Sequence, residues 1–384
     1  MLLRRSSLIK SPFLRLFSAT AAEPKMNLDD FRTIETNPTK HSKEHIGKYY
    51  QIDDTIRKKL FAHGGIPKKY EKQIKTFNES CLMVRPQAIE IIDFIKKTDF
   101  SKPTVRYVLY GERGAGKSMT LAHLAHYGYV NDFCLIHVPY APDWYKRPKE
   151  CGLSTIHEGM IDIPLECASW LIHFKLQNID LLTKIDAKTS KTYDWSKREQ
   201  TPAGSTLIEL VDHGINRAKY AADVIAALID EIKIASTAGK FKTMVLIDGF
   251  NSFFYEKTRV SVDKKARRWP VTPDKVTITQ PFINITNYDW CNGVCILTVD
   301  IIGMLGWDRE SNLPRYLLGK EGFEHLDPFV PIKMENYDDL QFNSCISYYV
   351  NRRWIQNTEK GFDQELKFMS NSNPYKLMEL CNAL

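Results

Sequence analysis

Residues 111 to 118 have the types and spacing that hold a phosphate. They read Gly-Glu-Arg-Gly-Ala-Gly-Lys-Ser and match the pattern G-x-x-x-x-G-K-[ST] of phosphate-binding loops. In such a loop the glycines let the backbone wrap a phosphate without a Cβ clash. Lys117 would bridge the β- and γ-phosphate oxygens, and the Ser118 hydroxyl would ligate Mg²⁺. The motif predicts nucleotide binding, but it establishes neither hydrolysis nor the base.

The segments on either side of this loop favour the same interpretation. Residues 105–110 are β-branched and aromatic, which predicts a buried strand, and a helix is expected to begin at residue 118. A strand, a glycine turn and a helix start place free N–H groups and the positive helix end around one anion. The residues that we expect to bind nucleotide are Gly111, Glu112, Arg113, Gly114, Ala115, Gly116, Lys117, Ser118 and Met119.

A second strand is expected to end in a metal-binding carboxylate. Residues 244–248 form an apolar run that ends in Asp248, and this residue would hold the Mg²⁺ shell through water. The predicted metal site therefore consists of Ser118 and Asp248, although an Asp that only caps a strand end is the alternative. The next predicted strand, 294–299, carries Thr298, either as a γ-phosphate sensor or as an ordinary buried threonine.

The residue after Asp248 bears on catalysis. ATPases of the AAA+ class usually place a glutamate there to activate water, but this sequence has Gly249. Without that carboxylate the attacking water has no evident general base. Glu256 or Asp300 could substitute, yet nothing in the sequence argues for either of them. We therefore expect slow or absent turnover and do not expect an active enzyme.

Composition limits the class of protein. A chain of 384 residues with 43% apolar content suggests two domains or one large domain. No run of about 18 apolar residues occurs, so no membrane-spanning helix is expected. The 8 cysteines contain no C-x-x-C pair, which favours buried reduced thiols over a metal site or a disulfide framework.

The N-terminal segment 1–22 is basic, serine-rich and free of acidic residues, which is typical of a mitochondrial targeting segment. A cleavage site is expected just after Phe17, and a disordered basic tail that binds RNA or lipid is the alternative. Removal of this segment lowers the net charge from +7 to about +3. Bulk charge is therefore weak support for nucleic-acid binding.

Two other segments are basic. Residues 23–80 combine lysine-rich patches with tyrosines and are expected to form an extended arm along RNA or another protein, with a solvated linker as the alternative. Residues 257–269 form a basic loop just past the nucleotide, either an RNA-phosphate contact or a solvated loop. Between them a helix is expected over 83–97. Its first residues Met83, Val84 and Arg85 would either touch the base or pack the helix start.

The remainder of the chain is mostly helical by pattern. Helices are expected over 164–185 and, as one long element, over 206–235, while 317–323 is turn-rich. The string Thr183-Lys184-Ile185-Asp186 imitates the T-K-x-D guanine-reading motif, but it precedes the Asp248 strand and its surroundings are helical, so we reject it. From about residue 338 the periodicity predicts a small α-rich subdomain that could act as a lid.

Several segments together resemble one family. They are 110–118, Asp248-Gly249-Phe250-Asn251, Leu-Leu-Gly-Lys-Glu-Gly-Phe at 317–323, Asp-Pro-Phe-Val-Pro at 327–331 and Ser-Asn-Ser-Asn-Pro at 370–374. The family is that of mitochondrial small-ribosomal-subunit proteins also called death-associated protein three, and the resemblance covers roughly 80–384.

This resemblance implies an α/β fold of the P-loop NTPase type, AAA+-like, with a parallel sheet flanked by helices. The expected division is a targeting segment 1–22, an extended arm 23–80, a nucleotide-binding core 81–335 and a helical C-terminal lid subdomain 336–384. The resemblance further implies GTP or GDP as the ligand, with ATP possible, together with Mg²⁺. The implied partners are mitochondrial ribosomal RNA, other mitochondrial ribosomal proteins and bridges to the large subunit, in the mitochondrial matrix.

The motifs and the resemblance together leave three possible functions. The first is a structural, nucleotide-holding ribosomal protein, and the second is a mitochondrial AAA+-like ATPase or GTPase that remodels a client. Gly249 argues against the second, which needs a catalytic carboxylate and an arginine finger. The third is an apoptosis-linked adaptor, against which the import-like leader argues.

Overall fold

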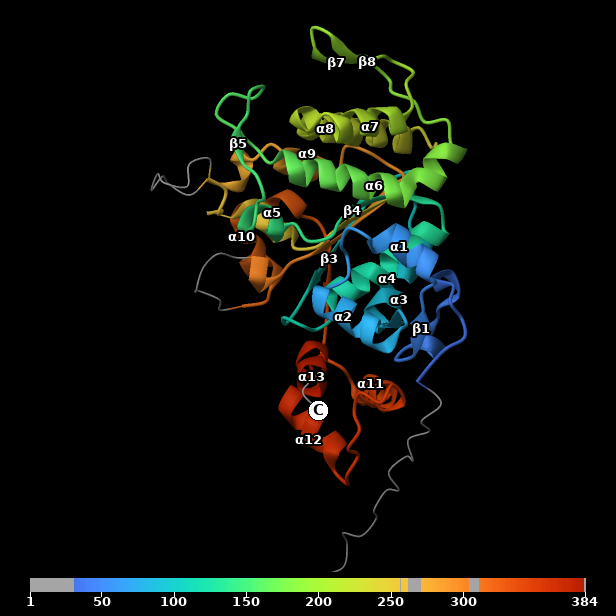
Figure 1. Ribbon diagram of the computed structural model, residues 1–384. Helices are drawn as coiled ribbons and strands as arrows, with labels where there is room; N and C mark the ends of the chain where they lie inside the picture. Colours follow the sequence, from blue (N-terminus) through green and yellow to red (C-terminus); the bar gives the residue numbers. More distant parts are fainter. Residues whose placement is uncertain (1–30, 256, 262–270, 304–310, 383–384) are drawn as a thin grey trace, which may run out of the picture.

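A parallel sheet forms the centre of the protein in a computed structural model, which describes residues 31–255, 257–261, 271–303 and 311–382 (Figure 1). The strand order is β11-β3-β10-β9-β4, and each neighbouring pair is parallel. The strands are β3 (Val105–Tyr110), β4 (Phe133–Val138), β9 (Lys242–Ile247), β10 (Gly293–Thr298) and β11 (Val330–Lys333). This confirms the predicted α/β class with a helix-flanked parallel sheet.

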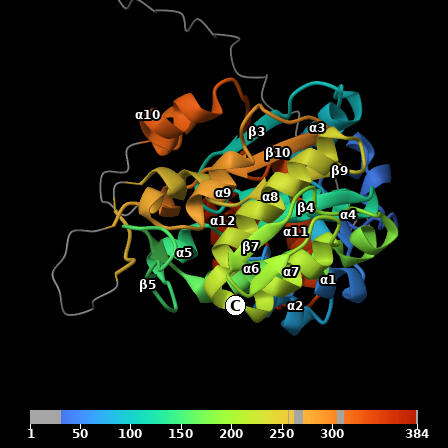
Figure 2. The same cartoon turned by 90° about the horizontal axis from the view of Figure 1, so that it is seen from above.

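Helices cover both faces of the sheet (Figures 1 and 2). One face packs against α1 (Asp54–Phe61), α2 (Lys68–Phe77), α3 (Pro86–Lys97) and α4 (Lys117–Val130). The other face packs against α6 (Pro164–Lys184), α7 (Leu207–Asn216), α8 (Ala221–Thr237), α9 (Thr279–Asn284) and α10 (Pro314–Leu326), with the short α5 (Pro142–Lys146) at its edge. The strands are therefore buried on both sides, as their continuous apolar runs predict.

The alternation of side chains along each strand explains the two hydrophobic cores. In β9, Val245 and Ile247 belong to the core under α6 and α8, while Met244 and Leu246 belong to the core under α3 and α4. Successive strand residues point to opposite faces. Since all four side chains are fully buried, the sheet anchors both layers and fixes the loops at its carboxyl edge.

The N-terminal segment differs from the expected extended arm. From residue 31 onward it is folded onto the core: β1 (Tyr49–Gln51) pairs antiparallel with β2 (Cys81–Met83), and α1 and α2 follow. The physical reason is its apolar content, because Tyr50, Ile52 and Leu60 are almost completely buried. The lysine-rich patches that suggested an arm occupy the exposed side of these short helices.

The C-terminal part of the chain is helical, as its pattern predicts, and consists of α11 (Asp339–Asn351), α12 (Phe362–Ser370) and α13 (Pro374–Cys381), which we call the C-terminal subdomain. Its core is shared with the N-terminal segment: Phe31, Tyr49 and Phe77 cluster with Tyr348 and other residues of α11 to α13. Figure 1 shows the subdomain beside the carboxyl-terminal end of the sheet. The two ends of the described chain therefore stabilise each other.

Two expected elements differ in detail. The long helix 206–235 is divided into α7 and α8, which pack side by side, and a Cβ on Gly214 would lie 2.8 Å from Val224 Cγ1. The chain turns back after α7 ends at Asn216, and the glycine at 214 allows the two helices to approach closely. The turn-rich stretch 317–323 lies within α10, which is kinked at Gly319, where φ is 66°.

Smaller features complete the fold. Two antiparallel hairpins, β5 (Gly152–Leu153) with β6 (Ile161–Asp162) and β7 (Tyr193–Ser196) with β8 (Glu199–Thr201), project from the core. The eight cysteines form no disulfide in the part of the chain that the structure describes. No helix within the described ranges is long and apolar enough to cross a membrane. Residues 1–22, Glu256 and most of the basic loop 257–269 lie outside the described residues.

Candidate functional site

Three strand ends meet at the carboxyl edge of the sheet. Thr298, the last residue of β10, pairs in register with Leu109 of β3, and Leu297 pairs with Ile247 of β9. The loop 111–118 follows β3 directly, and Asp248 follows β9. Ligands of open parallel sheets bind at this edge. The structure thus brings together the loop, Asp248 and Thr298, which lie far apart in the sequence.

The loop backbone depends on its glycines. Gly111, Gly114 and Gly116 have φ of 139°, 84° and 102°, in the range that L side chains rarely adopt. A Cβ on Gly111 would also lie 2.4 Å from the Met334 carbonyl oxygen. Gly116 precedes α4 in the left-handed conformation, so the helix begins at Lys117. The loop is therefore a tight turn that opens into a helix N-terminus, as predicted.

Lys117 is a buried residue of the loop and the first residue of α4. Its Nζ donates to the carbonyl oxygens of Gly111 and Glu112, both at 2.9 Å. The carboxylate of Asp300 lies 4.0 Å from the same nitrogen, and the Lys117 side chain is 4% exposed. Burial of an ammonium is costly unless an anion compensates it. This amine is therefore positioned to meet an anion held by the loop.

Asp248 is buried beside the loop and held by hydroxyl groups. Burial raises the pKa of its carboxyl to about 6, whereas hydrogen bonds from Ser118 and Thr298 lower it. The negative charge of Asp300 raises this pKa further, and the positive charge of Lys117 lowers it. Thr298 Oγ1 donates to the carboxylate at 2.5 Å. The Ser118 and Asp248 side chains predicted to hold a metal therefore face each other.

Gly249 has a structural reason to be glycine. Its φ is 75°, and a Cβ would lie 2.6 Å from Pro142 Cδ. A glutamate at this position would meet both backbone strain and a clash with α5. Asp300, whose carboxylate lies near Lys117, is bound through its backbone to the Asn251 side chain, which accepts its N–H at 3.1 Å.

Of the three residues proposed to touch the base, Arg85 alone reaches the loop. It is 5% exposed; Nη1 donates to the Ala115 carbonyl oxygen at 3.2 Å and Nη2 donates to that of Glu335 at 2.7 Å. Its guanidinium also lies over the Tyr337 ring. Met83 and Val84 belong to the hydrophobic cores and serve packing. Arg85 therefore supports the loop from behind.

The outer residues of the predicted site are less enclosed. Glu112 and Arg113 are exposed, and Met119 is partly buried against the core under α3 and α4. Thr183 and Lys184 end α6, where the Thr183 hydroxyl donates to the Ile179 carbonyl oxygen. The rejected T-K-x-D string is thus a helix end.

Two loop contacts come from the C-terminal subdomain and are not predicted by the sequence. Asn373 Nδ2 donates to the Arg113 carbonyl oxygen at 3.1 Å, and the Tyr375 N–H donates to that of Gly114 at 3.2 Å. The available signal was Asn373-Pro374, a helix cap followed by proline at the first helical position. Nothing in that signal indicates which other segment the cap contacts.

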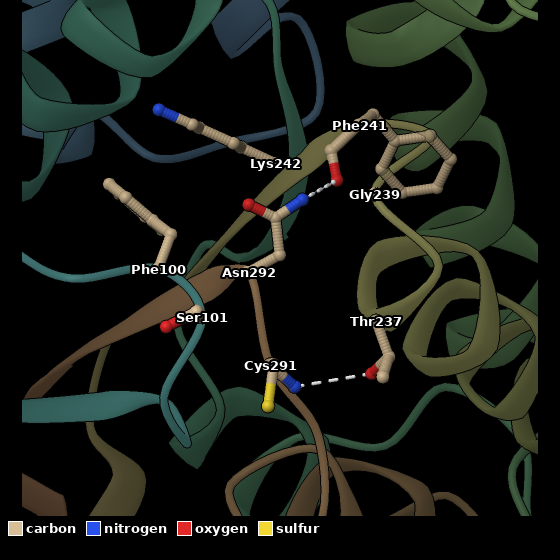
Figure 3. A pocket seen from close by; sticks show the side chains of 8 residues that line it. All are labelled: Phe100, Ser101, Thr237, Gly239, Phe241, Lys242, Cys291 and Asn292. Atoms are coloured by element: carbon tan, nitrogen blue, oxygen red, sulfur yellow. Dashed lines mark hydrogen bonds between the residues drawn. The ribbon is translucent and has the colours of Figure 1, made fainter.

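Two cavities lie at opposite edges of the sheet. The larger, about 600 Å³, is lined by Phe100, Ser101, Thr237, Gly239, Phe241, Lys242, Cys291 and Asn292 (Figure 3). This cavity lies where β9 and β10 begin. The Asn292 side-chain amide in its lining donates a hydrogen bond to the Phe241 carbonyl oxygen. A cavity of about 370 Å³ adjoins Gly111 and Glu112. This smaller cavity lies at the carboxyl edge of the sheet, beside the loop, and is therefore the candidate site.

Comparison with known proteins agrees with the resemblance. Residues 82–380 match the family model described as "Mitochondrial ribosomal death-associated protein 3". The chain belongs to this family. The "Small ribosomal subunit protein mS29" of Bos taurus is 40% identical over 92% of this chain and 88% of its own length. The protein of the same name from Mus musculus is 38% identical over 92% of this chain and 89% of its own length.

More distant similarities add little. The Neurospora crassa protein named "Small ribosomal subunit protein mS29" is 22% identical and covers 45% of this chain and 36% of its own length. A solved structure titled "Structure of E. coli MS115-1 HORMA:CdnC:Trip13 complex" covers 88% of this chain and 94% of its own at 9% identity and a TM-score of 0.28.

Proposed function

We propose that this protein is a structural component of the mitochondrial small ribosomal subunit that holds a guanine nucleotide and Mg²⁺ in the loop 111–118. Family membership and the printed names of the mammalian relatives support the ribosomal part. In this role it contacts ribosomal RNA and neighbouring ribosomal proteins, including bridge contacts to the large subunit, in the mitochondrial matrix. The P-loop NTPase fold, AAA+-like, is part of the same proposal.

The observation that carries the nucleotide proposal is the convergence of the loop, Lys117 and the Ser118–Asp248 pair on one edge of the sheet. The buried Lys117 ammonium faces only neutral carbonyl oxygens at hydrogen-bond distance. The Asp300 carboxylate lies farther away, at 4.0 Å. A phosphate in the loop would supply a closer anion, and the N–H groups at the start of α4 would bind its oxygens. The residues present therefore fit a nucleotide phosphate.

The metal would depend on the nucleotide. Among the described residues, no group of three or more His, Cys, Asp or Glu side chains could hold a metal ion. Mg²⁺ usually keeps several waters and takes few protein ligands beside substrate phosphates. Ser118 would supply one ligand, and Asp248 would orient a bound water. The guanine base rests on the family resemblance, and ATP remains the alternative ligand.

Retention of the phosphate rather than its cleavage follows from the surroundings of Gly249. The carboxylate that would activate water in a remodelling ATPase cannot be placed at this position without strain and a clash with Pro142. The nucleotide would then act as a ligand that stabilises the fold. Binding to the native state alone contributes about 2.7 kcal/mol when the free ligand is about 100-fold above its Kd.

Two measurements test the proposal. Mass spectrometry of nucleotide released from the purified protein should detect GTP or GDP, and sucrose-gradient sedimentation of a matrix extract should place the protein with the small subunit. A Lys117→Ala variant should lose the nucleotide and assemble poorly, while Lys240→Ala, at an exposed position just before β9 and so at the opposite edge of the sheet, is the control. A free oligomer with rapid ATP turnover would contradict the structural role. Normal assembly of a nucleotide-free Lys117→Ala protein would contradict the stabilising role.

A further inference from the structure

The side chain of Asn373 is completely buried between the loop and the C-terminal subdomain. Its Nδ2 donates to the Arg113 carbonyl oxygen at 3.1 Å and to Asn336 Oδ1 at 3.0 Å. Its Oδ1 accepts the Lys376 N–H at 3.2 Å and so caps α13. One amide therefore joins the start of α13, the chain that enters the subdomain and the backbone of the loop.

The first turn of α13 lies directly against the loop. A Cβ on Gly114 would lie 2.4 Å from Tyr375 Cβ and 2.7 Å from Asn373 Oδ1. The Tyr375 N–H also donates to the Gly114 carbonyl oxygen. No side chain larger than hydrogen fits between the two backbones. Movement of this part of the loop would therefore displace α13.

The hydrogen bond from Asn373 to the Arg113 carbonyl oxygen also orients the Gly114 N–H of the same peptide. In a trans peptide the carbonyl oxygen and the following N–H point in opposite directions. Asn373, by holding the Arg113 oxygen, fixes the direction of the Gly114 N–H. Arg85 holds the Ala115 oxygen and fixes the Gly116 N–H in the same manner. Hydrogen-bonded groups in series polarise and strengthen one another.

We propose that Asn373 is a positioning residue that couples phosphate in the loop to the docking of the C-terminal subdomain, an inference that rests on the nucleotide binding proposed above. An anion on the Gly114 N–H strengthens the Asn373 bond to the same peptide, and a docked α13 presents that N–H to the anion. Such coupling is reciprocal, so docking and binding favour each other by the same factor. The subdomain thereby reports whether the loop is filled.

Asn373→Asp tests this coupling. The carboxylate still caps α13 by accepting the Lys376 N–H, but it cannot donate to Arg113 or Asn336. Asp338→Asn is the matched control, because Asp338 caps α11 in the same subdomain by accepting the Gln341 N–H at 2.8 Å. Asn373→Ser provides a second, uncharged cap that is too short to reach the loop. Circular dichroism would verify that all three variants fold.

Two measurements decide the matter. GDP with Mg²⁺ should slow amide hydrogen exchange over 374–381 by about 10-fold in the wild-type protein and in Asp338→Asn. Both Asn373 variants should lose this protection and bind a fluorescent GDP analogue about 10-fold more weakly. Wild-type binding without protection of α13, or an Asn373 variant that retains both properties, would overturn the coupling alone. If the wild-type protein binds neither guanine nor adenine nucleotide, the proposed nucleotide binding fails and the coupling fails with it.

Discussion

The Thr298 hydroxyl links the ends of two neighbouring strands, since it donates to the Asp248 carboxylate at 2.5 Å and accepts the Gly249 N–H at 2.8 Å. Both partners follow β9, while Thr298 ends β10. The hydroxyl therefore sets the direction of the carboxylate that faces Ser118. The sequence left open whether Thr298 senses a phosphate or is an ordinary buried threonine. In the structure it is a buried residue that supports the carboxylate.

Thr298→Val should destabilise the protein and weaken metal-dependent binding. The substitution leaves the Gly249 N–H and one carboxylate oxygen without their partner, and each such loss typically costs about 1–3 kcal/mol. Urea denaturation would measure the stability. Nucleotide titrations with and without Mg²⁺ would show whether affinity falls only when the metal is present. Thr298→Ser retains the hydroxyl and should restore the Mg²⁺ effect; if Val and Ser behave alike, the hydroxyl has no such role.

Gly249→Glu should not create a nucleotidase. The side chain would need a left-handed backbone and the space that Pro142 occupies, so we expect a loss of about 1–3 kcal/mol in the free energy of unfolding. Phosphate release should stay at the wild-type level, and Gly249→Ala should destabilise as well. Thermal denaturation and a phosphate-release assay would check this. A stable, actively hydrolysing Gly249→Glu protein would show that a missing carboxylate alone prevents turnover.

The central strands and the loop could be predicted from sequence because their signals are local. Residues 105–110 form a β-branched and aromatic run that leads into a glycine turn, and they are a strand with the expected bounds. The spacing of Gly111, Gly116 and Lys117 is equally local, and it places the tight turn correctly before α4. The meeting of this loop with Asp248 followed from their places at parallel strand ends.

Contacts between distant segments could not be predicted. The tyrosines of 23–80 suggested an arm because nothing local shows that Tyr49 packs on Tyr348 of α11. Asn373 could be identified as a helix cap, but its contact with Arg113 depends on where the C-terminal subdomain docks. The division of 206–235 accompanies the packing of α7 against α8 and α6, which local periodicity does not show. In each case tertiary packing decides the outcome.

Acid should destabilise the protein below about pH 6.5 through buried histidines. His137 of β4 and His173 of α6 share a hydrogen bond at 3.1 Å, and Gln177 donates to His137. Burial lowers the pKa of His137 to about 4 and that of His173 well below 6.5. Both values lie below those of the unfolded chain. The contribution of the two neutral histidines to the free energy of unfolding is therefore complete above pH 6.5 and is lost as the pH falls toward 4.

Urea denaturation at several pH values would measure this dependence. The two histidines together should contribute a slope of up to about 2.7 kcal/mol per pH unit between pH 6 and pH 4.5. His173→Gln removes one titrating group and should reduce the slope by about 1.4 kcal/mol per unit. Leu176→Gln, at an exposed position of the same helix and without a titrating group, is the control. An unchanged slope in His173→Gln would show that this pair does not cause the acid sensitivity.

Adjacent tyrosines of β1 should stabilise different parts of the molecule. Tyr49 packs on Tyr348 with ring centroids 4.3 Å apart, whereas Tyr50 faces α4, where its ring lies 5.8 Å from that of His126. Neighbouring strand residues point to opposite sides, so one short strand joins two cores. Replacement of a buried aromatic residue by alanine costs about 3–5 kcal/mol. We expect Tyr49→Ala to speed amide exchange mainly in 339–351 and Tyr50→Ala mainly in 117–130. Each variant is the control for the other. A strand that only filled space would destabilise both regions together, so the same exchange pattern in the two variants would refute separate roles.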